Sequence, residues 1–253
     1  MQGRGSTAPA GVHPGRPYKN LSPMIKIIGF DADDTLWHNE SIFDRAQQRY
    51  RALLAKYHPA AEVDRVLFRT EMRNMPLYGY GVKGFMLSTV ETAIELTQGG
   101  ISAAEIREIV ALGQEMLAHP VELLPGVAEV VPALARDYRL LLITKGDLHH
   151  QERKIAASGL APHFSAIEIL SEKDGPAYSR VLRRHGVAVE EFAMVGNSVK
   201  SDIVPVLELG GAGVHVPYHI TWQHELGVEV PPGSARFRKV DRLAELPPLL
   251  PAL

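Results

Sequence analysis

Short apolar runs alternate with helical patterns through most of the chain. The runs are rich in aliphatic residues and lie at 25–30, 140–143, 165–170 and 192–195. Such runs are typical of parallel strands buried on both faces. Apolar residues recur every three to four positions near 127–136, 150–158, 176–185 and 201–209, before a last short apolar run at 213–216. The alternation predicts an α/β core built on a parallel sheet.

Between the first predicted strand and the rest of the core, the pattern is helical with almost no strand signal. Helices are expected near 42–57, 61–74, 84–98 and 103–118. We therefore predict an all-helical domain at 37–120, inserted into a core formed by 24–36 and 121–253. Residues 1–23 are rich in Gly and Pro and lack the apolar stretch of a signal peptide, so we expect a flexible tail outside the fold.

Several polar residues are expected to support helices. Asp34 is predicted to cap the turn that follows it, and Asp147 to cap the helix near 150. Ser41 with Asp44 three positions later resembles a capping box. Lys154 is expected on the exposed side of its helix.

The predicted strands end at residues suited to phosphoryl transfer. These are Asp31-Ala32-Asp33-Asp34-Thr35, Thr144, Lys173 and Gly196-Asn197-Ser198, with Asp202 shortly after. In parallel α/β sheets, ligands bind outside the carboxyl ends of the strands. We therefore expect these side chains to converge on one edge of the sheet.

Two carboxylates separated by one residue point to the same side of a strand, so Asp31 and Asp33 can meet one ligand. A carboxylate can attack phosphorus, and a second carboxyl can protonate the leaving oxygen and then deprotonate water. Mg²⁺ prefers oxygen ligands and offsets the repulsion between carboxylates and phosphate. The hydroxyl of Thr144, the turn at Lys145 and the ammonium of Lys173 are candidate phosphate ligands.

Four such motifs in this order resemble the haloacid dehalogenase-like (HAD) hydrolase superfamily over essentially residues 25–216. The family pattern is Asp-x-Asp-x-Thr, a strand-terminal Ser or Thr, a Lys and an acidic metal site. The resemblance implies a Rossmann-like core and a C1-type helical cap that opens and closes over the site.

The resemblance also implies roles for individual residues. Asp31 would be the nucleophile and Asp33 the general acid/base, with Thr144 and Lys173 binding phosphate. Mg²⁺ would be held by Asp31, Asp202 and the main-chain carbonyl of Asp33.

Two positions refine the comparison. Asn197 stands where the fourth motif often has an acid, so the metal site has one of the two possible carboxylates. Asn197 itself is expected to orient a metal-bound water or Asp31. The haloacid dehalogenases that name the superfamily lack the second acid of the first motif. The presence of Asp33 therefore favours cleavage of phosphate esters.

These features predict a Mg²⁺-dependent phosphomonoesterase that acts on a small soluble metabolite through an aspartyl-phosphate. A phosphotransferase or mutase of the same fold, and a catalytically silent binding protein, are the alternatives. A glycine-punctuated segment at 76–84 is expected to form a loop. Its candidates for substrate contact are Tyr78, Tyr80 and Lys83, although the tyrosines could equally pack between helices.

Composition narrows the partners and the compartment. The 253 residues carry a formal net charge of −2, which offers no basic surface for nucleic acid and no attraction to anionic lipid. No apolar stretch approaches the roughly 18 residues that a membrane span needs. Cysteine is absent, which removes disulfides and thiolate metal sites and favours the cytosol. The sequence determines neither the metabolite nor the oligomeric state.

Overall fold

The computed structural model describes residues 25–253, and the tail predicted at 1–23 lies outside them. Within this range a six-stranded sheet has the order β3-β2-β1-β4-β5-β6, and every pairing is parallel. The strands are β1 (Ile27–Phe30), β2 (Arg139–Lys145), β3 (Ala166–Leu170), β4 (Phe192–Gly196), β5 (Ala212–His215) and β6 (Phe237–Lys239). The predicted parallel α/β core is confirmed, whereas β6 is an edge strand that the apolar pattern did not reveal.

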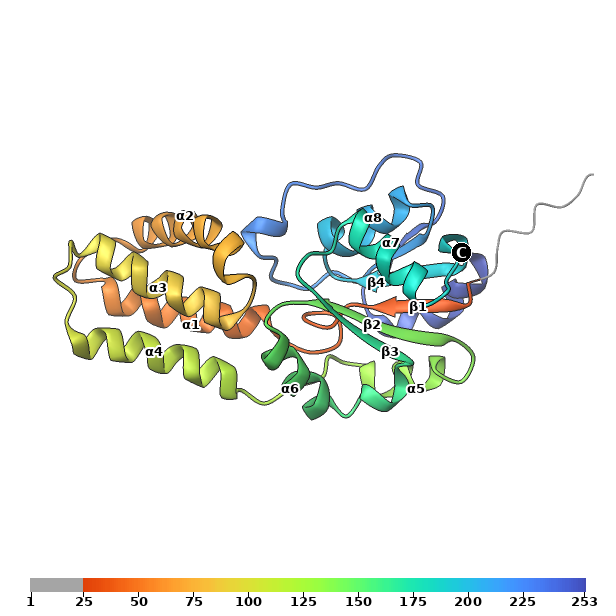
Figure 1. Ribbon diagram of the computed structural model, residues 1–253, viewed down its shortest axis with the longest axis horizontal. Helices are drawn as coiled ribbons and strands as arrows, with labels where there is room; N and C mark the ends of the chain where they lie inside the picture. The colour runs from red at the N-terminus through yellow and green to blue at the C-terminus, as the bar shows by residue number, and fades with distance from the viewer. Residues whose placement is uncertain (1–24) are drawn as a thin grey trace, which may run out of the picture.

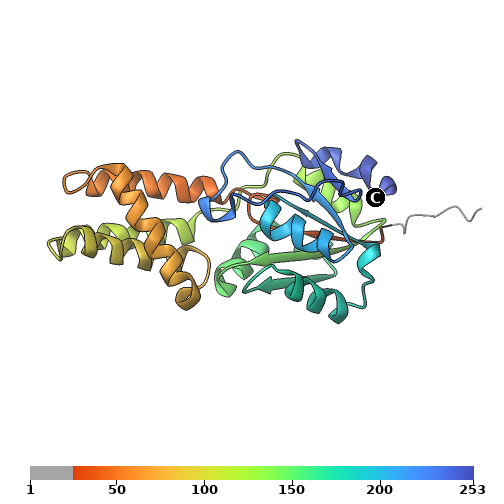
Figure 2. The same ribbon diagram turned by 90° about the horizontal axis from the view of Figure 1, so that it is seen from above.

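Helices cover both faces of the sheet (Figures 1 and 2). They are α5 (Val127–Leu134), α6 (Leu148–Ser158), α7 (Gly175–Arg184) and α8 (Val204–Glu208). Ile28 of β1 belongs to the apolar cluster that contains residues of α5 and α6, whereas Ile27 packs in the cluster that contains residues of α7 and α8. Because successive side chains of a strand point to opposite faces and both faces are covered here, β1 has no polar side chain at 27–30.

Four helices follow β1 and project to one side of the sheet (Figure 1). They are α1 (Glu40–Leu54), α2 (Ala60–Tyr78), α3 (Val82–Leu96) and α4 (Ala103–Ala118). They share a separate apolar cluster that includes Tyr50, Leu67 and Ile109. The predicted helical cap is therefore present, while its limits at 37 and 120 stay a prediction.

Three local predictions for this region and its neighbours were wrong. The segment 76–84 is mostly helical, because α2 continues through Pro76 to Tyr78 and only three residues separate it from α3. Ser41 does not cap α1, which begins one residue earlier and whose first amides donate to the Asp34 carboxylate. The helix expected at 201–209 starts as a π-helical turn, Val199–Ile203, before α8.

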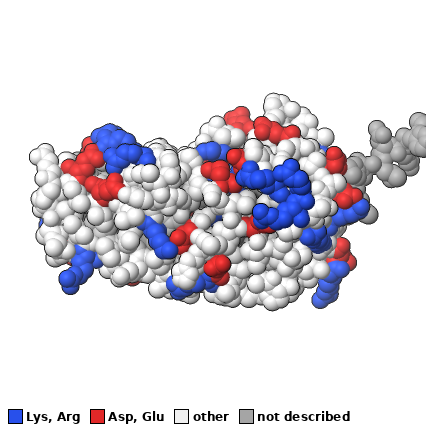
Figure 3. All heavy atoms as spheres, viewed as in Figure 1, with Lys and Arg blue, Asp and Glu red and all other residues white. Residues whose placement is uncertain are grey.

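The molecular surface carries charges of both signs. On the face shown in Figure 3, acidic and basic side chains are interspersed, with one group of Lys and Arg over the sheet-bearing part. Within residues 25–253, no helix combines the length and the apolar character that crossing a membrane would require.

Candidate active site

Asp31 follows β1 directly and lies in a buried ring of polar side chains. Its Oδ1 accepts a hydrogen bond from the Lys173 ammonium at 2.5 Å, and its Oδ2 accepts one from the Thr35 hydroxyl at 2.9 Å. Burial raises the pKa of Asp31 to about 7, although Lys173 acts in the opposite direction. The carboxylate therefore depends on nearby positive charge to stay ionised.

Lys173 joins two carboxylates that are far apart in the sequence. Its Nζ also donates to Asp202 Oδ1 at 2.6 Å, and the Lys173 and Asp202 side chains are each 1% exposed. Burial alone would lower the pKa of Lys173, but Asp202 and Asp31 raise it well above the usual value. The sequence-based expectation that Asp31, Lys173 and Asp202 gather at one point is met by the geometry.

The position of Asp202 requires a glycine at the end of β4. A Cβ placed on Gly196 would lie 2.2 Å from Asp202 Oδ2, closer than any real contact. That oxygen also accepts a hydrogen bond from the Ser198 amide at 3.0 Å. Next to it, the Asn197 amide donates to the Thr35 hydroxyl at 3.0 Å, and Thr35 in turn bonds Asp31. Asn197 thus lies close to Asp31 and is linked to it through Thr35.

Asp33 occupies a different electrostatic environment from Asp31. The Lys154 ammonium contacts both of its carboxylate oxygens, at 2.6 and 2.8 Å, and Trp37 Nε1 donates to it at 2.6 Å. Burial would raise the pKa of Asp33, but Lys154 and the hydrogen bonds lower it below the ordinary value. Placing Lys154 on the exposed side of its helix was therefore wrong, because α6 turns this residue toward the strand ends.

Gln151 connects Asp33 to Thr144. Its amide group lies 2.9 Å from Asp33 Oδ2, 3.1 Å from the Thr144 hydroxyl and 2.8 Å from the Lys145 carbonyl. Gln151 was not among the predicted site residues. A signal was available, since Gln151 and Lys154 are three positions apart and share one face of a helix that starts next to the end of β2. Asp147 caps that helix as predicted, accepting from the His150 amide.

Lys145 does not contact Asp31 or Asp33. Its ammonium lies 2.7 Å from Glu225 Oε1 and 2.9 Å from the Ser201 hydroxyl, and it stacks over the Tyr80 ring at 4.3 Å. The phosphate-binding role of Lys145 stays a prediction that these contacts do not favour. Glu225 was missed because it lies in an irregular stretch where periodicity says nothing about the path of the chain.

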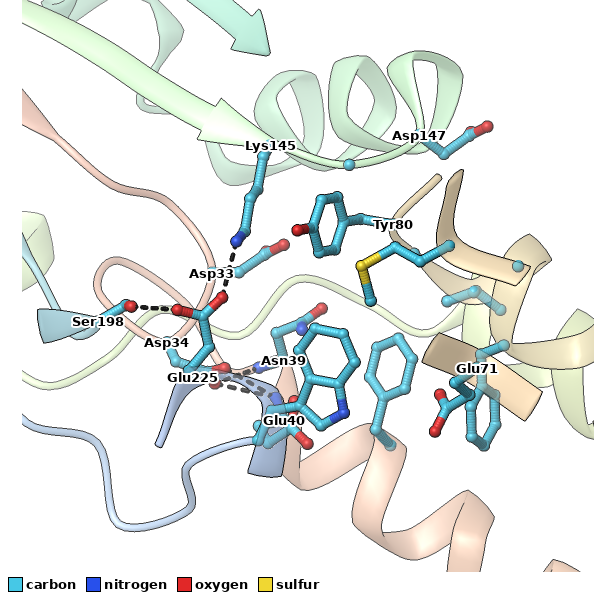
Figure 4. Close-up of a pocket in the computed structure, with 18 of the residues that line it drawn as sticks. Asp33, Asp34, Asn39, Glu40, Glu71, Tyr80, Lys145, Asp147, Ser198 and Glu225 are labelled. Atoms are coloured by element: carbon cyan, nitrogen blue, oxygen red, sulfur yellow. Dashed lines mark hydrogen bonds and ion pairs between the residues drawn. The ribbon is translucent and has the colours of Figure 1, made fainter. Parts of the chain in front are cut away.

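A cavity of about 390 Å³ opens over these residues between the sheet and the helical cap (Figure 4). Tyr78 and Tyr80 both line it. The Tyr80 hydroxyl donates to Glu172 of the core at 2.6 Å, whereas Tyr78 bonds Glu91 within the cap. Lys83 pairs with Asp147 at 3.0 Å, which ties the cap to α6. Substrate contact by these three residues stays a prediction.

The donors around Asp31 suit a small, hard cation. Asp31 and Asp202 bond the same ammonium, so their oxygens lie on one small volume at the strand ends. In residues 25–253, no group of three or more His, Asp or Glu has the arrangement of a metal site. Mg²⁺ needs no such group, because it keeps several waters and is commonly held by one or two carboxylates. The residues present therefore fit Mg²⁺ better than a transition metal.

Comparison with known proteins gives a consistent picture. The family model for haloacid dehalogenase-like hydrolases matches residues 25–207. The chain is 27% identical to the N-acylneuraminate-9-phosphatase of Rattus norvegicus over 240 residues, which cover 90% of this chain and 95% of the relative. It is 28% identical to the phosphoserine phosphatase of Thermus thermophilus over 211 residues, covering 71% of this chain and 83% of that one. A haloacid dehalogenase-like family hydrolase from Xanthomonas campestris has a similar structure, with 42% identity, a TM-score of 0.79, and coverage of 96% of this chain and 94% of the other.

Proposed function

Because the chain belongs to the haloacid dehalogenase-like hydrolase family, we propose that it is a Mg²⁺-dependent phosphatase that hydrolyses small phosphate monoesters with Asp31 as nucleophile. The observation that carries this proposal is the buried Asp31–Lys173–Asp202 group at the carboxyl end of the sheet. A carboxylate kept ionised by an ammonium that it shares with a second carboxylate is suited to attack a phosphorus atom bound there. The phosphatase relatives support the same reaction class.

Mg²⁺ would be held by Asp31, Asp202 and the main-chain carbonyl of Asp33. When bound, it would neutralise charge on the phosphoryl oxygens and lower their repulsion from the carboxylates. Lys173 contributes a second positive charge at the same point, and its raised pKa keeps it protonated through the neutral range. Thr144, near the end of β2, lines the same cavity and would bind phosphate through its hydroxyl.

The reaction proceeds in two steps on this chain's own side chains. Asp31 attacks phosphorus, the ester P–O bond breaks, and the leaving oxygen takes a proton from Asp33. Asp33 then accepts a proton from water, which attacks phosphorus and breaks the bond to Asp31. Lys154 favours ionised Asp33, the form that the second step requires. For the first step, Asp33 takes a proton from the bound monoanion of the ester, whose second pKa is about 6, and passes it to the leaving oxygen.

The charges on the cavity wall indicate what kind of leaving group is accepted. Among the described lining residues, every Lys and Arg is already paired with an acid. Glu40 and Glu71 also line the cavity without such a partner within residues 25–253, and burial raises their pKa values to about 7 and about 8. A second anionic group on the substrate would therefore find no free cation. We infer a preference for alcohols that carry no further anionic substituent.

This preference separates the chain from its relatives. The names of two of them refer to N-acylneuraminate and phosphoserine, and both of these compounds carry a carboxylate. The cavity is large enough for a sugar-sized group, because small-molecule sites of this kind start at about 300 Å³. Amino-sugar and polyol phosphates fit the charge pattern better than phosphoglycolate or nucleotides.

The test is turnover of p-nitrophenyl phosphate and of a metabolite panel, with and without Mg²⁺. We expect Mg²⁺-dependent phosphate release that Asp31→Asn abolishes, and ³²P label on the wild-type protein after rapid quenching in acid. Glu229→Gln is the matched control, because Glu229 is exposed and outside the cavity lining. Absence of turnover in the wild type, or full activity in Asp31→Asn, would disprove the proposal. Transfer to acceptor sugars in preference to water would reassign the chain as a phosphotransferase.

A further inference from the structure

The segment between β5 and β6 returns from the sheet toward the helical cap and brings Glu225 to the edge of the active-site cavity. This segment is blue in Figure 1, and its short helical turn Gln223–Glu225 lies between the sheet and the cap helices. Glu225 lines the cavity, and its side chain is 10% exposed. A carboxylate so enclosed needs partners, and its partners all belong to the core.

Glu225 contacts three core residues at once, and Figure 4 shows two of them, Lys145 and Ser198. Its Oε2 accepts hydrogen bonds from the hydroxyls of Ser198, at 2.5 Å, and Ser201, at 2.8 Å. Its Oε1 pairs with Lys145 at 2.7 Å, and Lys145 also bonds the Ser201 hydroxyl. Burial would raise the pKa of Glu225, but Lys145 and the serines lower it to about 2. Glu225 is therefore a fixed anion at any pH near neutrality.

The two serines belong to the turn that carries Asp202. The Ser198 hydroxyl accepts from the Ser201 amide at 3.0 Å, and the Ser198 amide donates to Asp202 Oδ2 at 3.0 Å. Glu225 is thus one residue removed from Asp202 through Ser198. The turn is a π-helical one, so the regular α-helical ladder does not set its geometry, and side-chain bonds have more influence on it.

We propose that Glu225 is a positioning residue that holds the Ser198–Asp202 turn in the geometry needed to bind a divalent cation, with Lys145 as its counter-ion. The inference rests on the proposed function of the site. Groups that bond a metal ligand directly typically change metal affinity or activity by roughly 10- to 100-fold when removed. Glu225 acts on Asp202 through Ser198, so we expect the lower end of this range. The affinity depends on how Asp202 is held, because Asn197 stands where a second acid is possible.

The test measures metal binding directly, without substrate. Glu225→Gln keeps the size of the side chain but removes its charge and one acceptor, and Glu229→Gln is the control with the same change on the exposed part of the segment. Free Mn²⁺ is counted by electron paramagnetic resonance during titration of each protein. We expect the Mn²⁺ dissociation constant to rise about 10-fold or more in Glu225→Gln and to stay within about twofold of wild type in Glu229→Gln.

Activity provides the second measurement. At saturating Mg²⁺, kcat of Glu225→Gln should return to within a few-fold of wild type, because the reacting groups are intact. Equal Mn²⁺ affinity in the two variants overturns the proposal. A loss of kcat that excess Mg²⁺ does not restore also overturns it.

A milder variant keeps the proposal testable if Glu225→Gln does not fold. Ser201→Ala removes one hydrogen bond to Glu225 but retains the pair with Lys145, and it should weaken Mn²⁺ binding by about 3- to 10-fold. Unchanged affinity in a folded Ser201→Ala would then overturn the inference. If the wild type binds Mn²⁺ but hydrolyses no phosphate ester, the proposed function fails while the role of Glu225 is still measured.

Discussion

Replacing Lys173 with Met removes the cation between two buried carboxylates. The methionine keeps the approximate length of the side chain, but Asp31 and Asp202 lose contacts of 2.5 and 2.6 Å. Removing one partner of a buried ion pair typically costs about 3–5 kcal/mol, because the remaining charge is left without compensation. For a chain of this size, that corresponds to a fall in Tm of roughly 6–20 °C.

The loss should depend on pH in a defined direction. Asp31 has a pKa of about 7 in the folded protein, above the unfolded value of about 3.9. Between these values the folded form binds more protons than the unfolded form, so the free energy of unfolding falls as the pH rises toward 7. Without Lys173 this pKa rises further. Each additional unit costs the variant about 1.4 kcal/mol at a pH above the new value. The variant should therefore be closer to wild type at pH 5.5 than at pH 8.5.

The assay is thermal unfolding at both pH values in the presence of EDTA, so that no divalent cation replaces the lysine. Lys56→Met is the control, because Lys56 forms an ion pair of 2.8 Å with Glu105 but is 64% exposed. Glu105 is buried but keeps its bonds from Ser102 and Tyr57, and a pair with a solvent-exposed lysine contributes about 0–1 kcal/mol. A deficit in Lys173→Met as small as that of the control, or one equal at the two pH values, would refute the reasoning.

Two further substitutions test the metal turn and the acid/base. Gly196→Ala would place a Cβ 2.2 Å from an Asp202 oxygen, so the carboxylate must move. A titration should show that a higher Mg²⁺ concentration is needed for half-maximal activity, and an unchanged concentration would contradict the geometry. Lys154→Met removes the cation that lowers the pKa of Asp33, so this pKa should rise. The acidic limb of phosphoenzyme hydrolysis, measured by quenched flow, should move to higher pH, and a limb that stays in place would exclude Asp33 as the base.

The sequence alone was sufficient for five strands of the sheet, the helical cap and the family, but not for the edge strand β6. Apolar runs of strand length define β1 to β5 because both faces of a parallel sheet are buried. The residues that end these strands meet because all the strands point the same way, so Asp31, Lys173 and Asp202 could be placed together before any coordinates. These conclusions depend on short-range hydrophobic patterns, and on the alternation of strands and helices, which predicts that the strands are parallel.

The tertiary structure alone decided how the site is charged and held. The rotation of α6 about its axis turns Lys154 onto Asp33. The spacing of Gln151 and Lys154 places them on one face of the helix, but only the tertiary structure shows that this face meets the strand ends. The return of the segment after β5 brings Glu225 to Ser198 and Lys145 from more than twenty residues away. Irregular segments follow paths set by the packing of the whole molecule. Their sequences have no hydrophobic periodicity, so the contacts of a residue such as Glu225 cannot be predicted from the pattern.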